Sequence, residues 1–357
     1  MSLTAEIRVR VEFAEELDAA QWAQRHADDL VPDQAPYGLD KLSLHGVHPA
    51  FREPVHSAAA RWFAGKVRDR FDGMELVAAL AGSLRRQWRS DAVLCMDERT
   101  GLPAALVPVS PPVVSGIAWI HRPEELRPGY RALVRRSLPR LDGIWTNVGP
   151  MVPLLQRQWG LSADRVHLLP LGIDSEFYPQ QPWPEQTGLV VSAGEDRMRD
   201  HELLVEAVRR VRETVPSVHL ELASSLPVPV EPALLTVHRR RMNGEMRDLY
   251  RRSTVVAVAL HQTPLGSGLT VVLEAMASGR PIVVTANPGI DEYVEHGVTG
   301  TLVPPGDPAA FARALRDLLS DSDRAREMGR NARMDVERRW TTGHMAAGLA
   351  ALITRSL

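Results

Sequence analysis

A glycine-rich turn separates an apolar run from a helical pattern in the second half of the chain. The turn, residues 263–268, has the sequence TPLGSG, and the apolar run before it, residues 255–260, predicts a short buried strand. A strand that feeds such a turn into a helix N-terminus brings free N–H groups and the positive end of the helix dipole to one point. This arrangement predicts a site for a phosphate-bearing ligand over Ser267 and Gly268, with Glu274 one to two turns further along the helix.

Polar residues follow two strand-like runs in the first half. Asp97, Glu98 and Arg99 come directly after the run 92–96, and His121 comes directly after the run 113–120. In an open parallel sheet, residues just beyond the strand ends face the ligand crevice. His121 is therefore a candidate for the chemistry, and a structural role for a lone histidine is the alternative. The other three residues are candidates for contacts with a ligand in the same crevice.

These candidates have to be positioned by a two-domain chain. The 357 residues exceed one ordinary domain, and strands alternate with helices in both halves. We predict an α/β fold of two doubly wound domains, residues 1–180 and 188–340, joined by a proline-rich linker at 181–187. Residues 341–357 are predicted to form a helix that packs back on the first domain. The cleft between the domains is the default site.

Periodicity and turn residues give the individual elements. The first half is predicted to have a half-buried strand at 7–13, a helix at 18–30 and a turn-rich stretch at 32–54. The strands predicted after these, from the apolar runs, are 92–96, 104–109, 113–120, 143–146, 166–170, 189–192, 218–223, 234–237, 255–260, 281–285 and 301–303. Helices are predicted at 57–71, 124–140, 151–159, 201–215, 245–252, 269–276 and 307–319, with a short helix at 289–294.

Composition excludes several classes of function. A formal net charge of -2 gives no support for a nucleic-acid partner. Cys95 is the sole cysteine, so we expect neither disulfides nor a cysteine-based metal cluster, and no metal ligand spacing is convincing.

Targeting signals are also missing from the sequence. The longest uncharged run, 102–120, contains prolines and does not predict a membrane span, and the charged stretch 6–12 excludes the apolar core of a signal peptide. We therefore expect a cytoplasmic protein. The basic amphipathic segment 57–71 leaves peripheral membrane attachment as an alternative to a helix packed on a sheet.

Several motifs of the second half occur together in one known family. Residues 190–208 read VVSAGEDRMRDHELLVEAV, residues 245–258 read EMRDLYRRSTVVAV, and residues 268–284 read GLTVVLEAMASGRPIVV. Residues 288–312 and the segment LPLGIDSEFYP at 169–179 complete the set. Together they resemble the retaining GT-B glycosyltransferases of the family 4 type, also called glycosyl transferases group 1. The resemblance implies the GT-B architecture, with two Rossmann-like domains that face a central cleft.

The resemblance implies roles for individual residues. Glu274 would hold the ribose hydroxyls of a nucleotide, and Arg199 or Arg197, in the turn after Gly194, would stabilise the leaving diphosphate. His121 would lie close to the reacting carbon of the sugar, and Asp97, Glu98 and Arg99, in the domain where this fold binds the acceptor, would lie on the acceptor side. The remaining donor-binding positions are the backbone and side chains of His261, Thr263, Gly266, Ser267, Gly268, Leu269 and Thr270.

Three positions depart from the family pattern. Gly266 stands where a glutamate contacts the donor sugar, so His261, Thr263 or backbone groups would have to replace it. The glycine-rich loop after the first strand is replaced by residues 13–16, FAEE, and the phosphate loop reads Gly194-Glu195.

The implied activity is that of a hexosyltransferase-type enzyme. It would move a sugar from a nucleoside-diphosphate sugar to a hydroxyl acceptor of unknown class, with retention of configuration, and without a bound metal or other cofactor. The alternatives are a nucleotide-sugar epimerase or hydrolase on the same scaffold, or a non-catalytic nucleotide-sugar-binding subunit. The base, the sugar, the acceptor and the oligomeric state cannot be read from the sequence.

Overall fold

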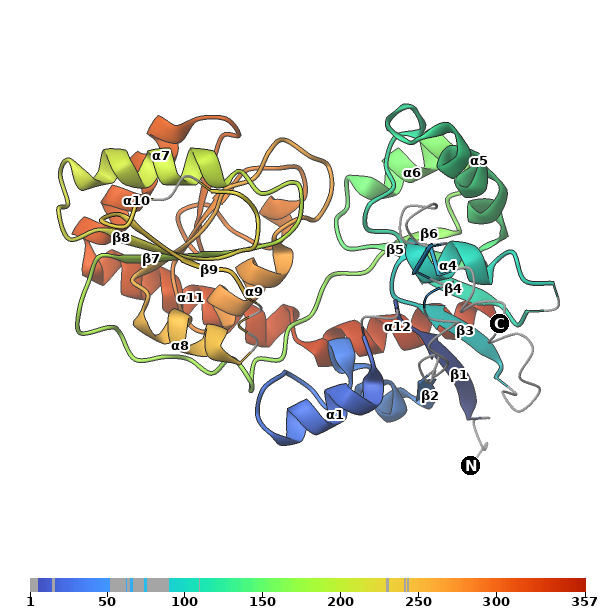
Figure 1. Cartoon of the computed structure of the whole chain (residues 1–357). Coiled ribbons are helices and arrows are strands. Elements are labelled where there is room, and N and C mark those ends of the chain that lie inside the picture. Colours follow the sequence, from blue (N-terminus) through green and yellow to red (C-terminus); the bar gives the residue numbers. More distant parts are fainter. Residues whose placement is uncertain are drawn as a thin grey trace. The chain divides into compact units, whose positions relative to one another are not determined.

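The architecture of the chain is given by a computed structural model (Figure 1). It describes residues 6–14, 17–51, 62, 65–66, 74–75, 90–108, 110–228, 231–240, 242 and 244–357. Most of the predicted helix at 57–71 lies outside the described residues.

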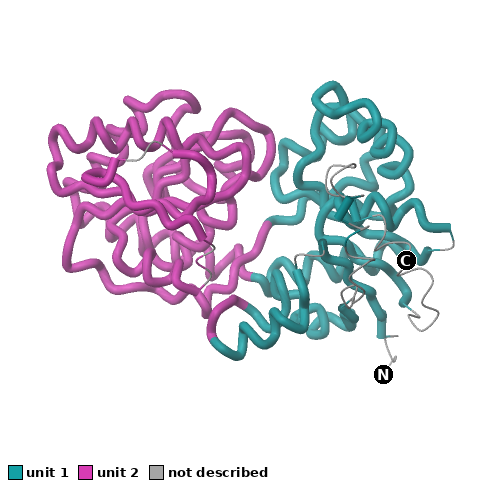
Figure 2. Tube along the Cα trace, in the orientation of Figure 1, with its two compact units in different colours: residues 1–28, 33–170, 342–357 teal, residues 29–32, 171–341 magenta. Residues whose placement is uncertain are grey.

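The chain divides into two compact units (Figure 2). The first contains residues 1–28, 33–170 and 342–357, and the second contains residues 29–32 and 171–341. Each unit is built on one six-stranded sheet whose strands all run parallel. This confirms the predicted fold class of two doubly wound α/β domains.

The sheet of the first unit has the strand order β2-β1-β3-β4-β5-β6. Its strands are β1 Ile7–Glu12, β2 Val47–Phe51, β3 Ala92–Cys95, β4 Val113–Gly116, β5 Gly143–Thr146 and β6 Val166–Leu168. The order reverses between β1 and β3, and ligands of such sheets bind beyond the carboxyl ends of the strands at this reversal. The segments that follow β1, β3 and β4 are therefore the ones that can form a site in this unit.

Helices cover both faces of this sheet, because right-handed crossovers in opposite directions along a sheet lie on opposite faces. α4, α5 and α6 connect successive strands in one direction, while α1 and η1 connect β1 to β2 in the other (Figure 1). The bounds are α1 Ala19–Ala27, η1 Pro36–His45, α4 Glu98–Ala104, η2 Pro123–Glu125, α5 Pro128–Ser137, η3 Leu138–Arg140 and α6 Met151–Trp159.

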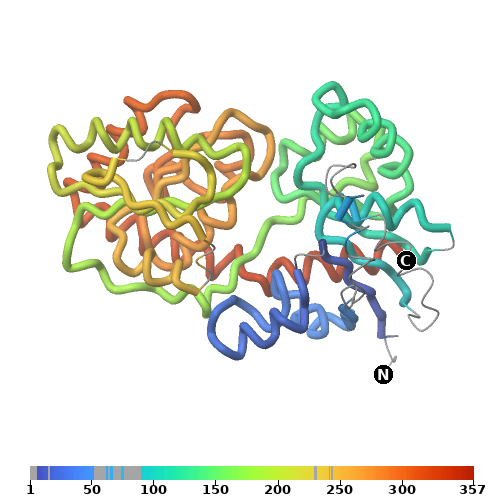
Figure 3. Tube along the Cα trace, viewed as in Figure 1, coloured from blue at the N-terminus to red at the C-terminus, as the bar shows by residue number. Residues whose placement is uncertain are grey.

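The C-terminal helix α12, Thr342–Ser356, belongs to the first unit and packs against η1 near the other end of the chain (Figure 3). Thr342 is buried at its start, where its hydroxyl accepts a hydrogen bond from Lys41 at 2.6 Å and donates one to Asp33 at 3.0 Å. These contacts fix the first turn of α12 on the N-terminal segment.

The sheet of the second unit has the order β12-β11-β10-β7-β8-β9. Its strands are β7 Leu189–Ala193, β8 His219–Ala223, β9 Leu235–His238, β10 Val255–Val258, β11 Ile282–Thr285 and β12 Thr301–Val303. The order reverses between β7 and β10, which makes the carboxyl ends of these two strands the ligand-binding point. All four residues of β10 are buried, and each of its three valine side chains contributes about 1.5–3 kcal/mol to folding.

The helices of this unit also form two layers (Figure 1). α7 packs with α10 on one face, and α9 packs with α11 on the other. The bounds are α7 His201–Arg212, α8 Glu245–Arg252, α9 Leu269–Ala277, η4 Ile290–Glu292, α10 Pro308–Ser320 and α11 Ser322–Arg339.

The segment 171–180 lies in the second unit, whereas the sequence assigned it to the first domain. Phe177 and Tyr178 are buried there, and Arg333 donates hydrogen bonds to the carbonyl groups of Ser175, Tyr178 and Ala277 at 2.9, 2.8 and 2.6 Å. Residues 29–32 belong to this unit as well.

Several predicted elements of the first half differ from the structure. The helix predicted at 124–140 is divided into η2, α5 and η3. The strand predicted at 104–109 is wrong: its start is the end of α4, whose apolar residues Leu102 and Ala104 face the core, and a turn follows. The strand predicted at 113–120 ends at Gly116. The turn-rich stretch 32–54 contains η1 and the edge strand β2, where Pro49 is tolerated because an edge strand has an unpaired side.

The strand predicted to be half-buried, β1, is covered on both faces. It lies between β2 and β3, and from Val9 onwards its polar residues Arg10 and Glu12 are buried as well as its apolar ones, whereas Arg8 is exposed. Arg10 and Glu12 pair with each other at 2.9 Å, which offsets part of the cost of burying two charges.

Candidate functional site

The carboxyl ends of β7 and β10 are joined by backbone contacts. Arg199 and Leu260 form an antiparallel bridge, the His261 N–H donates to the Met198 carbonyl at 2.8 Å, and the Asp200 N–H donates to the Ala259 carbonyl at 3.0 Å. These bonds place the loop after β7 beside the loop that leads into α9. The two loops in which the sequence places the donor-binding residues are thus neighbours at the reversal of strand order.

Arg199 lies across Gly194 at the start of the loop after β7. Gly194 has a φ of 149°, and a Cβ on it would overlap the Arg199 guanidinium group. Arg199 Nε donates to Asp196 Oδ2 at 2.7 Å, and the side chain is only 7% exposed. Glycine at this position therefore leaves the room that a buried arginine needs.

The other end of the Arg199 guanidinium group is directed at the N-terminus of α9. Arg199 Nη1 lies 3.4 Å from the position that a Cβ on Gly268 would take. Gly268 precedes α9 with a φ of 84°, and no side chain caps the helix there. The first amides of a helix have no acceptor within it, so this end of α9 offers N–H donors beside a cation.

Two polar atoms at this point are buried without a hydrogen-bond partner among the described residues. They are Arg199 Nη1 and Ser267 Oγ. A buried polar group without a partner costs about 1–3 kcal/mol, so such groups are commonly satisfied by a ligand or by ordered water. A cation, a hydroxyl group and a helix N-terminus together form a site for an anion, of which phosphate is the common example.

Glu274 lies further along α9, on the second turn. Its Oε1 accepts a hydrogen bond from the Tyr178 hydroxyl at 2.9 Å, and its Oε2 accepts one from the Tyr250 hydroxyl at 2.6 Å. Burial raises the pKa of Glu274, while the two hydroxyl donors and the positive charge of Arg199 act to lower this pKa. A carboxylate has about four acceptor positions, so one on each oxygen remains for a ligand hydroxyl.

The loop before α9 is held by Asn287, which follows β11. The Asn287 side chain accepts from the Thr263 N–H at 3.2 Å and donates to the His261 carbonyl at 3.0 Å. Thr263 is buried, and its hydroxyl accepts from the Leu265 N–H at 3.2 Å. His261 Nδ1 lies 3.3 Å from Asp200 Oδ2, and its side chain is 57% exposed. His261 can therefore contact a ligand, whereas the Thr263 hydroxyl already accepts a hydrogen bond within the loop.

The remaining predicted donor-binding residues lie in or beside the same loop. Gly266 is partly exposed, and its carbonyl accepts from the Leu269 N–H at 3.4 Å. Leu269 is buried, so only its backbone can meet a ligand, whereas Thr270 is exposed at the start of α9. Arg197 is also exposed, and this distinguishes it from the buried Arg199.

His121 belongs to the first unit, in the segment after β4. The ring is buried, its Nε2 lies 2.7 Å from Glu125 Oε2, and its Nδ1 lies 3.4 Å from the Trp119 carbonyl oxygen. Trp159 Nε1 donates to the His121 carbonyl at 3.1 Å. The imidazole is thus oriented by a carboxylate, and a partner of this kind on one ring nitrogen sets the state of the other.

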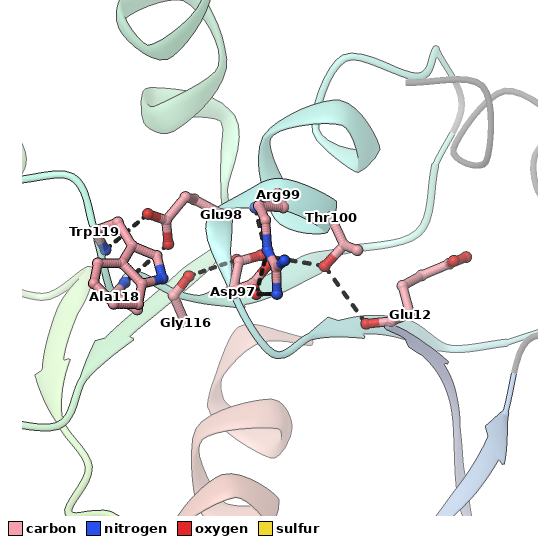
Figure 4. A network of polar contacts seen from close by, with 9 residues as sticks. Glu12, Asp97, Glu98, Arg99, Thr100, Gly116, Ala118 and Trp119 are labelled. Atoms are coloured by element: carbon pink, nitrogen blue, oxygen red, sulfur yellow. Dashed lines mark hydrogen bonds and ion pairs between the residues drawn. The ribbon is translucent and has the colours of Figure 1, made fainter. Parts of the chain in front are cut away.

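The three acidic and basic residues after β3 form a network at the same edge of this sheet (Figure 4). The Glu98 side chain is buried and accepts from the N–H groups of Ala118 and Trp119 at 2.9 and 2.8 Å. Burial raises the pKa of Glu98 to about 7, and the charge of Asp97 adds to this rise. Glu98 therefore holds the backbone that leads to His121.

Asp97 and Arg99 have structural contacts of their own in Figure 4. Asp97 caps α4 by accepting from the Arg99 N–H at 3.0 Å, and it pairs with the Arg99 guanidinium group at 2.7 Å. Both side chains are partly exposed. A contact of either with an acceptor stays a prediction, whereas the Glu98 carboxylate is already engaged.

Sequence reasoning did not identify Tyr178, Tyr250, Asp196 or Asn287 as members of the site. Asp196 is three residues from Arg199, a spacing that could have indicated a pair. Tyr178 is 96 positions and Tyr250 is 24 positions from Glu274, and no local pattern connects residues at such separations.

The described part of the chain contains no group of three or more His, Cys, Asp and Glu side chains suited to hold a metal ion. No helix among the described residues is long and apolar enough to cross a membrane.

Residues 186–321, which include Arg199, Ser267 and Glu274, match the family model for glycosyl transferases group 1. The chain is 30% identical over 222 residues to D-inositol 3-phosphate glycosyltransferase of Xylanimonas cellulosilytica, a match of 55% of this chain and 52% of that protein. It is 26% identical over 259 residues to alpha-maltose-1-phosphate synthase of Mycolicibacterium smegmatis, covering 62% and 66% of the two chains. The chain thus spans about half to two thirds of the length of these relatives.

Solved structures match over almost the entire chain. Sucrose-phosphate synthase of Thermosynechococcus elongatus superposes with a TM-score of 0.74 at 18% identity, covering 98% of both chains. HepE of Anabaena, solved with UDP and glucose, superposes with a TM-score of 0.63 at 17% identity, covering 97% of this chain and 99% of that chain. These similarities show that the chain has the GT-B fold.

Proposed function

We propose that this protein is a retaining glycosyltransferase of the hexosyltransferase type. It takes a nucleoside-diphosphate sugar as donor and a hydroxyl compound as acceptor. The observation that carries the proposal is the pair of buried, unpartnered atoms Arg199 Nη1 and Ser267 Oγ at the N-terminus of α9, with the Glu274 carboxylate on the next turn. The match of residues 186–321 to group 1 glycosyltransferases supports the proposal. The similarity to D-inositol 3-phosphate glycosyltransferase and to alpha-maltose-1-phosphate synthase supports it as well.

The proposed donor pose follows from the charges. The diphosphate lies over Gly268 and Ser267, where it accepts from the α9 amides, the serine hydroxyl and Arg199. The ribose hydroxyls donate to the free acceptor positions of Glu274. Arg199 is the cation that stabilises the charge developing on the diphosphate as the glycosidic bond breaks, and no metal ion is assigned this task.

The proposed reaction is a front-face substitution. The bond from the anomeric carbon to the diphosphate oxygen breaks, the bond to the acceptor oxygen forms on the same face, and the acceptor proton goes to the departing phosphate. No protein nucleophile is needed. His121 is assigned to the reacting carbon by the family resemblance, and its Glu125 contact keeps its ring oriented.

A product assay tests the proposal. Each nucleotide sugar is incubated with the enzyme, with and without a mixed pool of hydroxyl acceptors, and the nucleotide and sugar products are separated. The proposal predicts nucleotide release that depends on the acceptor and is lost in Arg199→Ala. Equal release without acceptor identifies a hydrolase, an isomerised donor identifies an epimerase, and binding without turnover identifies a non-catalytic subunit.

A further inference from the structure

The Glu274 carboxylate is held between two tyrosine hydroxyls that come from different parts of the second unit. Tyr178 lies in the segment that leads into β7, and Tyr250 lies on α8. Each hydroxyl donates to a different carboxylate oxygen, Tyr178 to Oε1 and Tyr250 to Oε2. Both carboxylate oxygens of Glu274, the residue proposed to bind the ribose, are therefore fixed by tyrosine side chains. Neither the family resemblance nor the sequence pattern had indicated these tyrosines.

The two tyrosines are themselves immobilised by packing. Tyr178 is 4% exposed and Tyr250 is 0% exposed. Their rings meet edge to face with centroids 6.1 Å apart, and the Phe177 ring lies edge to face against Tyr178 at 5.0 Å. Aromatic pairs at such distances stabilise a fixed mutual orientation. The two hydroxyl groups therefore have little freedom to follow a carboxylate that moves.

Tyr178 is also anchored through its backbone. Arg333 Nη1 donates to the carbonyl groups of both Tyr178 and Ala277, at 2.8 and 2.6 Å. Ala277 is the last residue of α9, the helix that carries Glu274. One guanidinium group thus fixes the spacing between the Tyr178 segment and α9, and this spacing determines the hydrogen bond from Tyr178 to Glu274.

A fixed carboxylate differs from a free one in the acceptor positions that it offers. The terminal torsion of a glutamate side chain is broad, so an unrestrained carboxylate samples many orientations. With one donor on each oxygen, the plane of the Glu274 carboxylate is set, and one acceptor position on each oxygen is left for a ligand. Two such positions, side by side and preorganised, suit two adjacent hydroxyls of one ligand.

We propose that Tyr178 and Tyr250 are positioning residues that orient the Glu274 carboxylate for the hydroxyl groups of the donor nucleotide. This inference rests on the proposed function, because it needs Glu274 to be a nucleotide ligand. The hydroxyl groups also act on the charge state. Burial raises the pKa of Glu274, whereas the Tyr250 and Tyr178 hydroxyls and the Arg199 charge, the groups facing the carboxylate from α8, the Tyr178 segment and the loop after β7, oppose the rise.

Tyrosine-to-phenylalanine variants separate the hydroxyl groups from the packing of the rings. The binding of UDP, GDP and TDP to the full chain is measured by calorimetry for the native protein, Tyr178→Phe, Tyr250→Phe and the double variant. Each single substitution is expected to weaken the binding of the tightest-binding nucleotide about three- to tenfold, because the Glu274 carboxylate loses part of its preorganisation for the ligand. Tyr293→Phe is the matched control, because this buried hydroxyl of the same unit accepts from the Leu171 N–H at 2.8 Å instead.

Two further readouts distinguish orientation of Glu274 from a general loss of structure. In a Glu274→Ala background, Tyr178→Phe is expected to change the affinity by less than about twofold, because the partner of the hydroxyl is gone. Nucleotide affinity is also measured as a function of pH. Because the tyrosine hydroxyls lower the pKa of Glu274, the loss of affinity at acid pH is expected to begin at a higher pH in Tyr178→Phe and Tyr250→Phe and at the native pH in Tyr293→Phe. Thermal unfolding of every variant identifies a substitution that prevents folding. If one tyrosine variant does not fold, the affinity of the other tyrosine variant tests the positioning role.

The outcomes separate this inference from the proposed function. If Glu274→Ala binds the nucleotide more weakly while Tyr178→Phe and Tyr250→Phe bind as the native protein does, the positioning role is overturned and the proposed function stands. Equal losses in the tyrosine variants and in Tyr293→Phe overturn the positioning role too. If the native protein binds none of the three nucleotides, the proposed function itself fails.

Discussion

Arg199 occupies the space over Gly194 that a side chain at that glycine would need. The φ of 149° at Gly194 adds backbone strain for any residue with a Cβ. The buried cation of the candidate donor site therefore depends on a glycine five positions earlier in the same loop.

Gly194→Ala is predicted to displace Arg199 and to weaken nucleotide binding by at least about tenfold, because the guanidinium group loses its place beside α9. We expect a stability loss of about 1–3 kcal/mol from the strain. Calorimetry and urea unfolding measure the two effects. Gly160→Ala is the control: its φ of 66° carries similar strain, but nothing lies within 4 Å of the added Cβ, so its affinity should stay native.

The two arginines of the loop after β7 are predicted to differ in importance. Arg199→Ala removes the buried charge beside the leaving group and should lower kcat about 10²- to 10³-fold. Arg197 is exposed, and Arg197→Ala should lower kcat less than about fivefold. Steady-state kinetics with the active nucleotide sugar provide the comparison. An equal or larger effect at Arg197 would assign the leaving-group role to the exposed residue.

His121 is predicted to act in the chemical step and not in nucleotide binding. It lies in the first unit, whereas the anion-binding groups at α9 lie in the second. His121→Ala should lower kcat about 10²-fold or more and leave the affinity for nucleoside diphosphate within about twofold. Glu125→Gln, which removes the carboxylate charge 2.7 Å from the imidazole, should lower kcat about tenfold. A drop in affinity that equals the drop in kcat would contradict the assignment.

Glu98 is predicted to make stability depend on pH. Its pKa is about 7 in the folded chain against a usual value of 4.5, so the folded state keeps this proton longer than the unfolded state. The contribution of Glu98 to stability is therefore most favourable below about pH 4.5, becomes less favourable as the pH rises towards about 7, and is constant above that. The change is on the order of 3 kcal/mol.

Urea unfolding of the native chain and of Glu98→Gln at pH 5 and pH 8 measures how much Glu98 changes the free energy of unfolding with pH. From pH 5 to pH 8 the native chain should lose stability through Glu98, whereas Glu98→Gln should not show this loss, because glutamine does not titrate. The difference in stability between the two proteins should therefore shift in favour of Glu98→Gln. Glu327→Gln, a substitution of an exposed glutamate on α11, is the matched control. Parallel pH profiles for the native chain and Glu98→Gln would show that the buried carboxyl does not titrate in this range.

In the second half of the chain, the elements predicted from the sequence agree closely with those of the structure. The predicted strand 301–303 and helix 245–252 have the observed bounds, because Gly300 and Pro304 flank the strand and Gly244 and Ser253 flank the helix. The first half was harder. Ala104 is buried as the last residue of α4, and residues 105–108 form a turn, but a short apolar run does not distinguish a helix end and a turn from a strand.

The candidate site was predicted only in part for a similar reason. The turn before α9 and the position of Glu274 follow from local sequence, since a glycine-rich turn that starts a helix has a spacing signal. The contacts of Glu274 do not. Tyr178 and Tyr250 reach it only after three separate segments pack together, and tertiary contacts of this kind leave no periodicity in the chain.

The most direct test of the central claim is the calorimetric binding of UDP, GDP and TDP to the native chain and to Arg199→Ala. A nucleoside-diphosphate site built on Arg199, Ser267 and the N-terminus of α9 predicts that at least one of the three binds the native chain. That nucleotide should bind Arg199→Ala at least about tenfold more weakly. Binding that is equally tight in both proteins, or no binding of any nucleotide to the native chain, would contradict it.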